Sequence, residues 1–396
     1  MNIVISDVCN RSCPYCFAAL KVSYPEDGKP GGDNGNYIST ENFQRCLDFL
    51  KQSGERKLKL LGGEPTVHPR FIELVSMGLA GDFSVSVFSN GIWSAAVRSF
   101  FQSQQTSGVE FLINVNERNA QKERETLLQE KSLAVAGPRA RLSFNIYRHD
   151  FNLAFATELI EKYGLKREMR LGLAHPVVGA ENEYPPDSSL KTIGKRLIDQ
   201  MRMLESRDIL ATFDCGFPLC MFDEEDFGVL VKCSNGFISI CEPIIDVGAD
   251  LSVWPCFPLA KVANTTLDQF PDKNAMVAAY AKSMGPLRQM GSMDECIDCK
   301  YMRRGQCCGG CVGRTIRNWE RSGAGDVASR IKAPTHEPWQ QIADGGPCPF
   351  SHDRQSENRR GFHPGPARPE PAARFHRKWK LPHIIGRQRP NRQAAP

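Results

Sequence analysis

The sequence lacks the long hydrophobic runs of membrane proteins and the charged, apolar leader of secreted ones. No segment approaches the roughly 20 apolar residues that a membrane-spanning helix needs. Residues 2–6 are strand-like, and nothing before them has the character of a secretory signal, so we expect none. In a protein that is not exported, 15 cysteines indicate metal sites in a reducing cytoplasm rather than disulfides.

A fourth cysteine is missing from the first cysteine motif. Cys9, Cys13 and Cys16 have the spacing C-x3-C-x2-C, and no further cysteine lies nearby. A closed zinc or iron–sulfur site takes four protein ligands, so three thiolates leave one metal position open. Neither common ferredoxin spacing fits this run. A structural zinc loop is the alternative interpretation.

A glycine turn follows the second expected strand. The apolar residues 58–61 lead directly into Gly62, Gly63, Glu64 and Pro65. Glycines after a strand let a ligand approach the backbone closely. A carboxylate such as that of Glu64 can hold an ammonium group by charge-assisted hydrogen bonds.

Together the two motifs resemble those of the radical SAM (S-adenosylmethionine) superfamily, whose signature is C-x3-C-x-aromatic-C, with Tyr15 as the aromatic residue. The resemblance implies a [4Fe–4S] cluster on the three cysteines, with its fourth iron chelated by the amino and carboxylate groups of SAM. One electron from the reduced cluster then breaks the S–C5′ bond, and the 5′-deoxyadenosyl radical takes a hydrogen atom from a substrate. The family's GGEP motif meets the methionyl amino group of SAM.

Hydrophobic patterns predict alternating strands and helices up to residue 173. We expect strands at 2–6, 58–61, 83–88, 109–115, 141–147 and 169–173. We expect helices beginning at Ser39 or Thr40 and near 70–80, 93–104, 119–136 and 152–165. Alternation of this kind is typical of parallel βα units with right-handed crossovers. The family's fold is a partial (β/α)6 barrel, so we expect an α/β chain of that class, with Cys46 in its core.

Ligands of parallel βα folds bind at the carboxyl ends of the strands. The polar residues expected near these ends are Ser89, Asn90, Asn114, Asn116, Asn145 and Arg170. The resemblance implies SAM contacts for Ser89 and Asn90. For the others a solvated strand end is an equal alternative, and Arg170 could pair with a carboxylate of SAM or substrate or with a neighbouring acid.

A second concentration of cysteines lies beyond residue 214. Its members are Cys215, Cys220, Cys233, Cys241, Cys256, Cys296, Cys299, Cys307, Cys308, Cys311 and Cys348. The series resembles the SPASM extension of radical SAM peptide-modifying enzymes, which binds auxiliary [4Fe–4S] clusters. It departs from that pattern in three ways: Leu251 replaces the glycine of Gly-x4-Cys, the middle spacing is x7 instead of x5, and Cys348 lies far downstream.

The resemblance implies two ligand sets. Cys241, Cys256 and Cys311 would serve one cluster, completed by Cys233 or Cys220. The other set would be Cys296, Cys299 and Cys307, completed by Cys348 or Cys308. A zinc knuckle is the rival interpretation of the second set. Cys215 and Cys220 could ligate a cluster, line a substrate channel or return a hydrogen atom, or they could be core residues, and this choice stays open.

Length and charge suggest how the chain is divided. At 396 residues it exceeds the size of one hydrophobic core, and we expect a barrel over 1–210 and a cysteine-rich auxiliary domain over 211–349. Residues 350–396 hold 11 Lys and Arg against 3 Asp and Glu, and this Pro- and Arg-rich tail is expected to be disordered. The remainder is therefore slightly acidic, which argues against nucleic acid as a substrate.

Three functions are compatible with these features. The first is radical modification of a peptide or protein, although no leader-binding domain is expected before the first strand. The second is the same chemistry on a small metabolite such as a sugar, an amino acid or an antibiotic precursor. Both would need SAM and a low-potential electron donor of the flavodoxin or ferredoxin type. The third is a non-catalytic iron–sulfur scaffold.

Overall fold

All five residues of the first strand, β1 (Asn2–Ser6), are buried, which indicates that the strand lies inside the sheet and not at its edge. Such a strand must be covered on both faces, as in parallel βα folds. The computed structural model describes residues 1–22, 36–103, 108–117, 122–242, 244–328, 331 and 334. Cys348 and the basic tail lie outside the described residues, as does most of the loop expected near residues 22–37.

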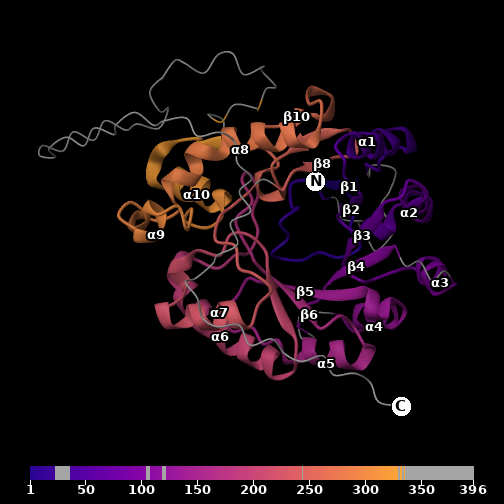
Figure 1. The fold of residues 1–396 in the computed structure, drawn as a ribbon, viewed down its shortest axis with the longest axis horizontal. Helices are drawn as coiled ribbons and strands as arrows, with labels where there is room; N and C mark the ends of the chain where they lie inside the picture. Colours follow the sequence, from indigo (N-terminus) through magenta and orange to yellow (C-terminus); the bar gives the residue numbers. More distant parts are fainter. Residues whose placement is uncertain are drawn as a thin grey trace, which may run out of the picture. The chain divides into compact units, whose positions relative to one another are not determined.

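In the described part of the chain, ten strands form one curved sheet in the order β10-β9-β8-β1-β2-β3-β4-β5-β6-β7 (Figure 1). Neighbours from β8 through β1 to β7 are parallel, whereas β8–β9 and β9–β10 are antiparallel. The strands after β1 are β2 (Lys57–Gly62), β3 (Ser84–Ser89), β4 (Val109–Asn114), β5 (Ala140–Ile146), β6 (Glu168–Leu173), β7 (Leu210–Phe213), β8 (Asp246–Val247), β9 (Ser252–Trp254) and β10 (Thr265–Thr266).

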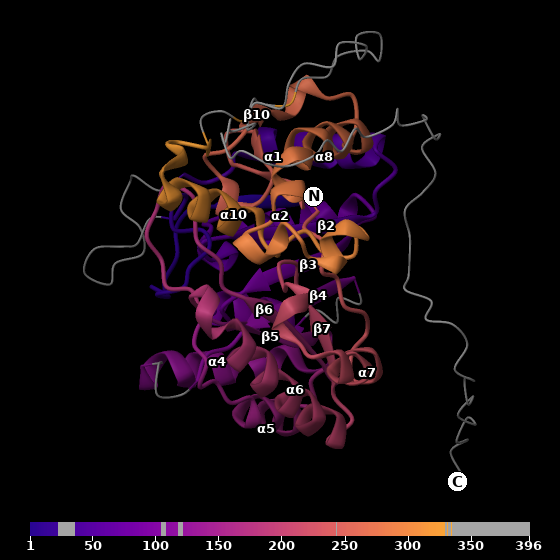
Figure 2. The same cartoon turned by 90° about the vertical axis from the view of Figure 1, so that its left-hand side faces the viewer.

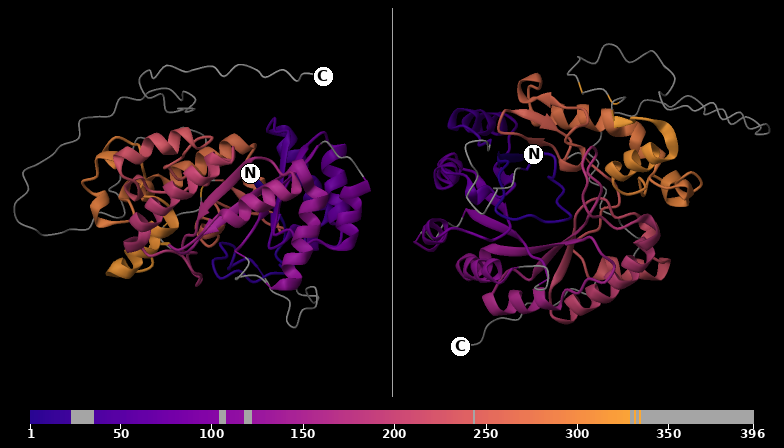
Figure 3. Two further views of the ribbon diagram at one scale, coloured as in Figure 1. Left: turned by 90° about the horizontal axis from the view of Figure 1, so that it is seen from below. Right: turned by 180° about the vertical axis from the view of Figure 1, so that it is seen from behind.

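Helices follow the outer side of this sheet in chain order, and the loop after β1 lies on its inner side (Figures 1 and 3). The helices are α1 (Thr40–Gln52), α2 (Phe71–Ala80), α3 (Ala95–Ser103), α4 (Glu123–Ala136), α5 (Ala154–Tyr163), α6 (Leu190–Ser206), α7 (Phe227–Lys232), α8 (Lys273–Met290), α9 (Lys300–Arg303) and α10 (Val312–Trp319). Figure 2 shows α8 and α10 together at one end of the molecule and α4, α5 and α6 at the other. The fold is thus an α/β partial barrel, as the sequence predicts.

The six predicted strands and five predicted helices are all present. Ser39 caps α1, because its hydroxyl accepts a hydrogen bond from the Asn42 amide at 3.1 Å. Cys46 is fully buried in that helix, which confirms its place in the core. The helix expected from 93 begins two residues later, and the start expected near 119 lies outside the described residues.

The sheet continues past the boundary expected at residue 210. β7 pairs with β6, and β8 pairs with β1, so strands from the cysteine-rich region extend the barrel sheet at both ends. The described residues fall within one compact unit, Met1–Pro349. Within them, no helix is both long and apolar enough to cross a membrane.

Asp246, on β8, carries a carboxyl that is 2% exposed and accepts a hydrogen bond from Asn2 at 2.7 Å. Burial raises the pKa of Asp246 to about 7 from an ordinary value of 3.8. The folded state therefore holds a proton that the unfolded state releases near pH 4, so its stability falls as the pH rises from about 4 to 7.

We expect the free energy of unfolding to fall by about 3 kcal/mol between pH 5 and pH 8 because of this one group, at 1.36 kcal/mol per pKa unit. Denaturant titrations of wild type and Asp246→Asn at both pH values test this. Between pH 5 and pH 8 the free energy of unfolding of Asp246→Asn should fall by about 3 kcal/mol less than that of the wild type. Parallel pH dependence in the two proteins would contradict the assignment.

Candidate functional site

The cysteine loop, residues 7–16, leaves β1 and carries Cys9, Cys13 and Cys16 as free thiols. Cys9 is buried, whereas the other two are partly exposed. Burial raises the pKa of Cys9, and the neighbouring Glu64 carboxylate and the thiols of Cys13 and Cys16 add to the effect. The three thiols thus lie on one short loop and are close enough for Cys13 and Cys16 to influence the pKa of Cys9.

The turn at Gly62 and Gly63 is joined directly to the cysteine loop. The Gly63 amide donates to the Ser6 carbonyl at 2.9 Å, and the Glu64 amide donates to the Val8 carbonyl at 2.8 Å. A methyl group at Gly63 would lie 2.6 Å from the Val8 oxygen and 2.8 Å from Cβ of Cys9. Glycine is needed here because the two backbones approach too closely for any side chain.

Glu64 is completely buried, and its carboxylate is engaged within the protein. It accepts hydrogen bonds from the Thr66 amide (3.2 Å) and hydroxyl (2.7 Å), the Ser89 hydroxyl (2.8 Å) and the Asn90 amide (2.7 Å). Burial raises the pKa of Glu64, and these donors oppose that shift. The structure shows a carboxylate that fixes the end of β3 against the glycine turn. Direct contact with an ammonium group stays a prediction.

Asn90 connects the end of β3 to the cysteine loop. Its side-chain amide donates to the Asn10 side chain at 2.8 Å and lies 3.9 Å from Sγ of Cys9. Gln129, on α4, donates to the Asn90 carbonyl at 2.6 Å and to the Asn114 carbonyl at 3.1 Å. The predicted residues Ser89, Asn90 and Asn114 are thus brought to the cysteine loop.

Tyr15 is buried and holds the loop against the next two strands. Its hydroxyl accepts a hydrogen bond from Asn114 at 2.9 Å and also pairs with Asn116. Asn145 donates to the Asn114 side chain at 3.0 Å, which extends the polar row to β5. The tyrosine ring stacks on Tyr147 with centroids 4.8 Å apart. The aromatic position of the motif therefore anchors the loop.

Two further contacts, one of the cysteine loop and one of the end of β3, were not predicted. Arg11 is buried and forms an ion pair with Glu125 of α4 at 3.4 Å. Trp93 donates from its indole to the Ser89 hydroxyl at 2.8 Å. No local pattern indicates the Arg11–Glu125 pair, because it joins distant segments, whereas Trp93 and Ser89 are only four residues apart in the sequence.

Arg170 forms an ion pair with Asp214, the residue that follows β7, and lies 5.9 Å from the Phe88 ring. Of the partners considered for Arg170, the structure provides the neighbouring acid. Asp214 precedes Cys215, so the polar row of the strand ends leads into the second concentration of cysteines.

The thiols of Cys241, Cys256 and Cys311, one predicted set, influence one another's pKa values. Burial and then the thiols of Cys311 and Cys241 raise the pKa of Cys256. Burial and the Cys241 thiol also raise the pKa of Cys311 to about 12. Leu251, at the position of the expected glycine, has a left-handed φ of 64°. That conformation favours glycine, so the departure from the pattern keeps the backbone that a glycine would adopt.

The thiols of Cys299 and Cys307 influence the pKa of Cys296, the third member of the other predicted set. Burial raises the pKa of Cys296, and the thiols of Cys307 and Cys299 contribute. Of the residues proposed to complete the sets, Cys233 lies 3.5 Å from a carboxylate oxygen of Glu205 instead of beside these thiols. Within the described residues, no three His, Cys, Asp or Glu side chains are grouped so that they could hold a metal ion.

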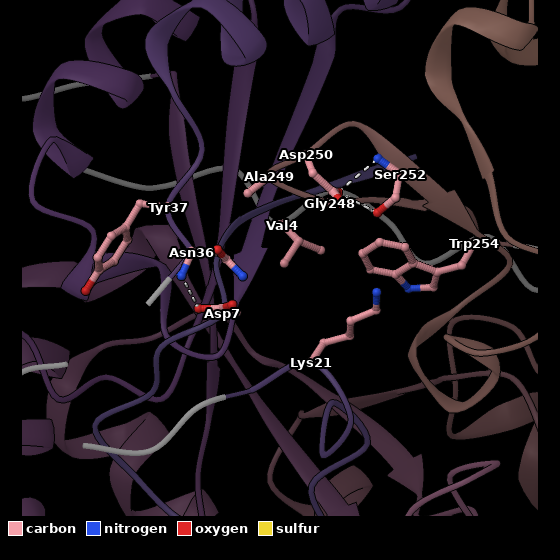
Figure 4. A pocket seen from close by; sticks show the side chains of 10 residues that line it. All are labelled: Val4, Asp7, Lys21, Asn36, Tyr37, Gly248, Ala249, Asp250, Ser252 and Trp254. Atoms are coloured by element: carbon pink, nitrogen blue, oxygen red, sulfur yellow. Dashed lines mark hydrogen bonds between the residues drawn. The ribbon is translucent and has the colours of Figure 1, made fainter. Parts of the chain in front are cut away.

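A pocket of about 260 Å³ lies between β1 and the β8–β9 hairpin (Figure 4). Asp7 and Asn36 line one side, and Gly248 and Trp254 line the other, with the Lys21 ammonium 4.6 Å from the Trp254 ring. None of the predicted site residues lines this pocket.

Comparison with known proteins gives a family match and a set of similar folds. The sequence model of the Radical SAM superfamily matches residues 3–116. A GTP 3′,8-cyclase of Desulforamulus reducens is 28% identical over 117 residues, covering 29% of this chain and 34% of that protein. Human molybdenum cofactor biosynthesis protein 1 is 30% identical over 94 residues, covering 23% and 14%. The matched segment thus spans about a third or less of these relatives.

Solved structures resemble more of the chain. SuiB of Streptococcus suis bound to the precursor peptide SuiA has a TM-score of 0.53 at 14% identity, covering 80% of this chain and 72% of that one. Histidine-tagged anSMEcpe with bound AdoMet has a TM-score of 0.52 at 17% identity, covering 84% and 89%. At such identities the likeness shows the fold. The segment that matches the Radical SAM superfamily, residues 3–116, contains both the cysteine loop and the glycine turn joined to it.

Proposed function

We propose that this enzyme cleaves SAM reductively and abstracts hydrogen from a peptide or protein substrate. The observation that carries the proposal is the cysteine loop joined to the Gly62–Gly63 turn at the carboxyl ends of β1 and β2. Three soft thiolates on one loop fit a [4Fe–4S] cluster and leave one iron for SAM. When bound, the cluster and SAM supply a 5′-deoxyadenosyl radical.

The chain's own residues would hold and orient SAM around that loop. We propose cofactor contacts for the predicted set Tyr15, Gly62, Gly63, Glu64, Pro65, Ser89, Asn90, Asn114 and Arg170. The buried Glu64 carboxylate and the Tyr15 hydroxyl would act by fixing the neighbouring backbone, because both are already paired within the protein. Arg170 would act together with its partner Asp214.

The cysteine-rich region, which we propose as an auxiliary domain over 211–349, would hold one or two auxiliary [4Fe–4S] clusters. Two features support this proposal: thiols within each predicted set influence one another's pKa values, and the backbone at Leu251 is left-handed, as the glycine of the SPASM pattern would allow. A low-potential flavodoxin or ferredoxin in the cytoplasm would supply the electron.

A peptide or protein is the first candidate substrate. The solved structures of similar fold include SuiB bound to a precursor peptide and anSMEcpe bound to AdoMet and the Kp18Cys peptide, the latter with a TM-score of 0.51. A small metabolite is the second candidate, because GTP 3′,8-cyclases are among the relatives in sequence. The structural likeness extends over about four-fifths of the chain and therefore favours the peptide.

Substrate-dependent SAM cleavage tests this choice. We expect the reconstituted, dithionite-reduced full chain to form 5′-deoxyadenosine faster when supplied with a peptide substrate, to be sought among short Cys-, Gly- or aromatic-rich peptides encoded by neighbouring genes. The same assay with GTP should stay at the rate without substrate. Chromatography with mass spectrometry measures the nucleoside and any change in peptide mass. Acceleration by GTP and not by peptide would establish the second candidate.

A further inference from the structure

The connection between β6 and α6 contacts two parts of the molecule that are far apart in the sequence. We call residues 175–187 the connecting segment; it follows the carboxyl end of β6. The amide of Glu183 in this segment donates a hydrogen bond to the Pro14 carbonyl at 2.8 Å. Pro14 lies between Cys13 and Cys16, so the connecting segment reaches the middle of the cysteine motif.

Side chains of α10, in the cysteine-rich region, bind the other end of the connecting segment. Nη1 of Arg314 donates to the Asp187 carboxylate at 2.5 Å and to the Pro185 carbonyl at 2.9 Å. The Arg314 guanidinium also lies 5.4 Å from the centre of the Tyr184 ring. Asn318, one turn further along α10, donates to the second carboxylate oxygen of Asp187 at 2.7 Å. Both oxygens of Asp187 are therefore bound by α10.

Burial distinguishes the Arg314–Asp187 ion pair from the other charged contact between these two segments. The side chain of Arg314 is 3% exposed and that of Asp187 is 32% exposed. A buried charge is costly unless it is paired, so Arg314 depends on its partner. Arg317 pairs with Glu181, whose side chain is 85% exposed, and exposed pairs contribute little to stability.

Backbone contacts fix the start of the connecting segment to the same region. The Val178 amide donates to the Pro258 carbonyl at 2.9 Å. A methyl group at Gly313 of α10 would lie 3.0 Å from the Pro176 carbonyl, so the helix approaches this backbone closely. The cysteine-rich region therefore contacts the connecting segment near both of its ends.

The bond to Pro14 differs in origin from the other contacts of the cysteine loop described above. Those contacts come from the glycine turn, from the ends of β3 and β4 and from α4, all of which belong to the barrel. The connecting segment instead ties the loop to Arg314, 300 positions later in the chain than Pro14. A change in the cysteine-rich region can therefore reach the cysteine loop through this segment.

We propose that Arg314 is a positioning residue for the cysteine loop, which it holds in place through Asp187 and the hydrogen bond to Pro14. The inference rests on the proposed function, because it gives the position of this loop a role in SAM cleavage. Reaction rates fall steeply when reacting groups are displaced by about 1 Å. Loss of the Arg314–Asp187 pair should therefore slow cleavage although every cysteine is still present.

Hydrogen exchange of the reconstituted full chain, kept anaerobic, tests the connection to the loop. Arg314→Lys keeps the charge but lacks the planar fork that binds Asp187 and Pro185 together, and Asp187→Asn removes the carboxylate. In both variants we expect amide exchange, followed by mass spectrometry, to be at least tenfold faster at Glu183 and in the peptide that contains the cysteine loop. The double variant Asp187→Asn/Arg314→Met should behave in the same way, and it leaves no unpaired charge in the interior that could prevent folding.

SAM cleavage and electron paramagnetic resonance test the consequence for function. Arg314→Lys and Asp187→Asn should form 5′-deoxyadenosine at least tenfold more slowly than the wild type, with unchanged iron content. The change that SAM causes in the spectrum of the reduced cluster should also differ from that of the wild type. A residue that only stabilised the fold would leave this spectral change as it is in the folded fraction.

Glu55→Gln is the matched control. Glu55 forms an ion pair with Lys273 of α8, and the two side chains are 31% and 24% exposed, so this pair also joins the barrel to the cysteine-rich region. It precedes β2 and therefore lies at the amino end of that strand, whereas the cysteine loop lies at the carboxyl ends. Glu55→Gln should keep wild-type exchange in the cysteine loop and wild-type cleavage.

The outcomes separate this inference from the proposed function. Unchanged exchange in the cysteine loop of the folded Arg314 and Asp187 variants would overturn the positioning role, and so would faster exchange with wild-type cleavage. An equal loss of cleavage in Glu55→Gln would also overturn it, because any contact between the two regions would then suffice. A wild type that forms no 5′-deoxyadenosine would overturn the proposed function, whereas the exchange measurement would still report whether Arg314 holds the loop.

Discussion

Replacing Cys9, Cys13 and Cys16 together with alanine should lower the bound iron by about four atoms per chain and abolish SAM cleavage. The three thiols gather on one loop at the strand ends, and each side of that loop is fixed by contacts that do not involve the thiols. The variant should therefore keep its fold while losing the cluster. Iron analysis and 5′-deoxyadenosine formation, measured on the same preparation, test the expectation.

Cys46→Ala is the matched control, because Cys46 is a fully buried thiol on α1 with no proposed ligand role. It should keep the iron content and the cleavage activity of the wild type. Persistent SAM cleavage by the triple variant would contradict the assignment of the cysteine loop. So would loss of cleavage in Cys46→Ala with the fold intact.

Gly63→Ala should lower SAM cleavage by about a hundredfold or more, since a displacement of about 1 Å can cost that much in rate. The added methyl group would overlap the Val8 carbonyl and Cβ of Cys9, and both are parts of backbone-anchored segments. Relief requires the glycine turn and the cysteine loop to move apart. We also expect a stability loss of about 1–3 kcal/mol from overpacking.

Gly228→Ala controls for the chemical change itself. Gly228 lies on α7, where an added methyl group would meet no atom within 4 Å, so activity should be unchanged. Cleavage rates and thermal melts of both variants provide the comparison. Wild-type cleavage in Gly63→Ala would show that the close approach of the two backbones is not needed for function.

The barrel was predictable because its signals are local. Each strand up to β6 is a short apolar run, and each helix has its own spacing of apolar residues. α6 carries an equally plain pattern, with Leu190, Ile193, Leu197 and Met201 buried, but no element was predicted between residues 173 and 215. The pairing of β8 with β1 joins residues more than 240 positions apart, and no local pattern indicates it.

In the candidate site, too, the residues in local motifs could be predicted and the contacts between distant segments could not. The cysteine loop and the glycine turn are contiguous motifs, so their residues could be named from the sequence. The role of the Glu64 carboxylate could not, because its donors Ser89 and Asn90 come from another strand. The Arg11–Glu125 pair and the hydrogen bonds of Gln129 likewise depend on the packing of α4.

Cysteine spacing alone could not complete the ligand sets. Spacing placed Cys241 with Cys256, and Cys296 with Cys299, because those intervals are short. Cys220 is separated by more than 70 residues from the second set, so spacing could not decide whether it belongs there. The left-handed backbone at Leu251 could not be predicted either, because leucine rarely adopts a positive φ and so gives no sign of one in the sequence.

Formation of 5′-deoxyadenosine by the reconstituted wild type tests the central claim most directly. Under anaerobic conditions with dithionite and SAM, the enzyme should release 5′-deoxyadenosine together with methionine, and should release neither when reductant is omitted. A non-catalytic iron–sulfur scaffold would bind the same iron and form no 5′-deoxyadenosine. That second result, from protein carrying its full complement of clusters, would contradict the account.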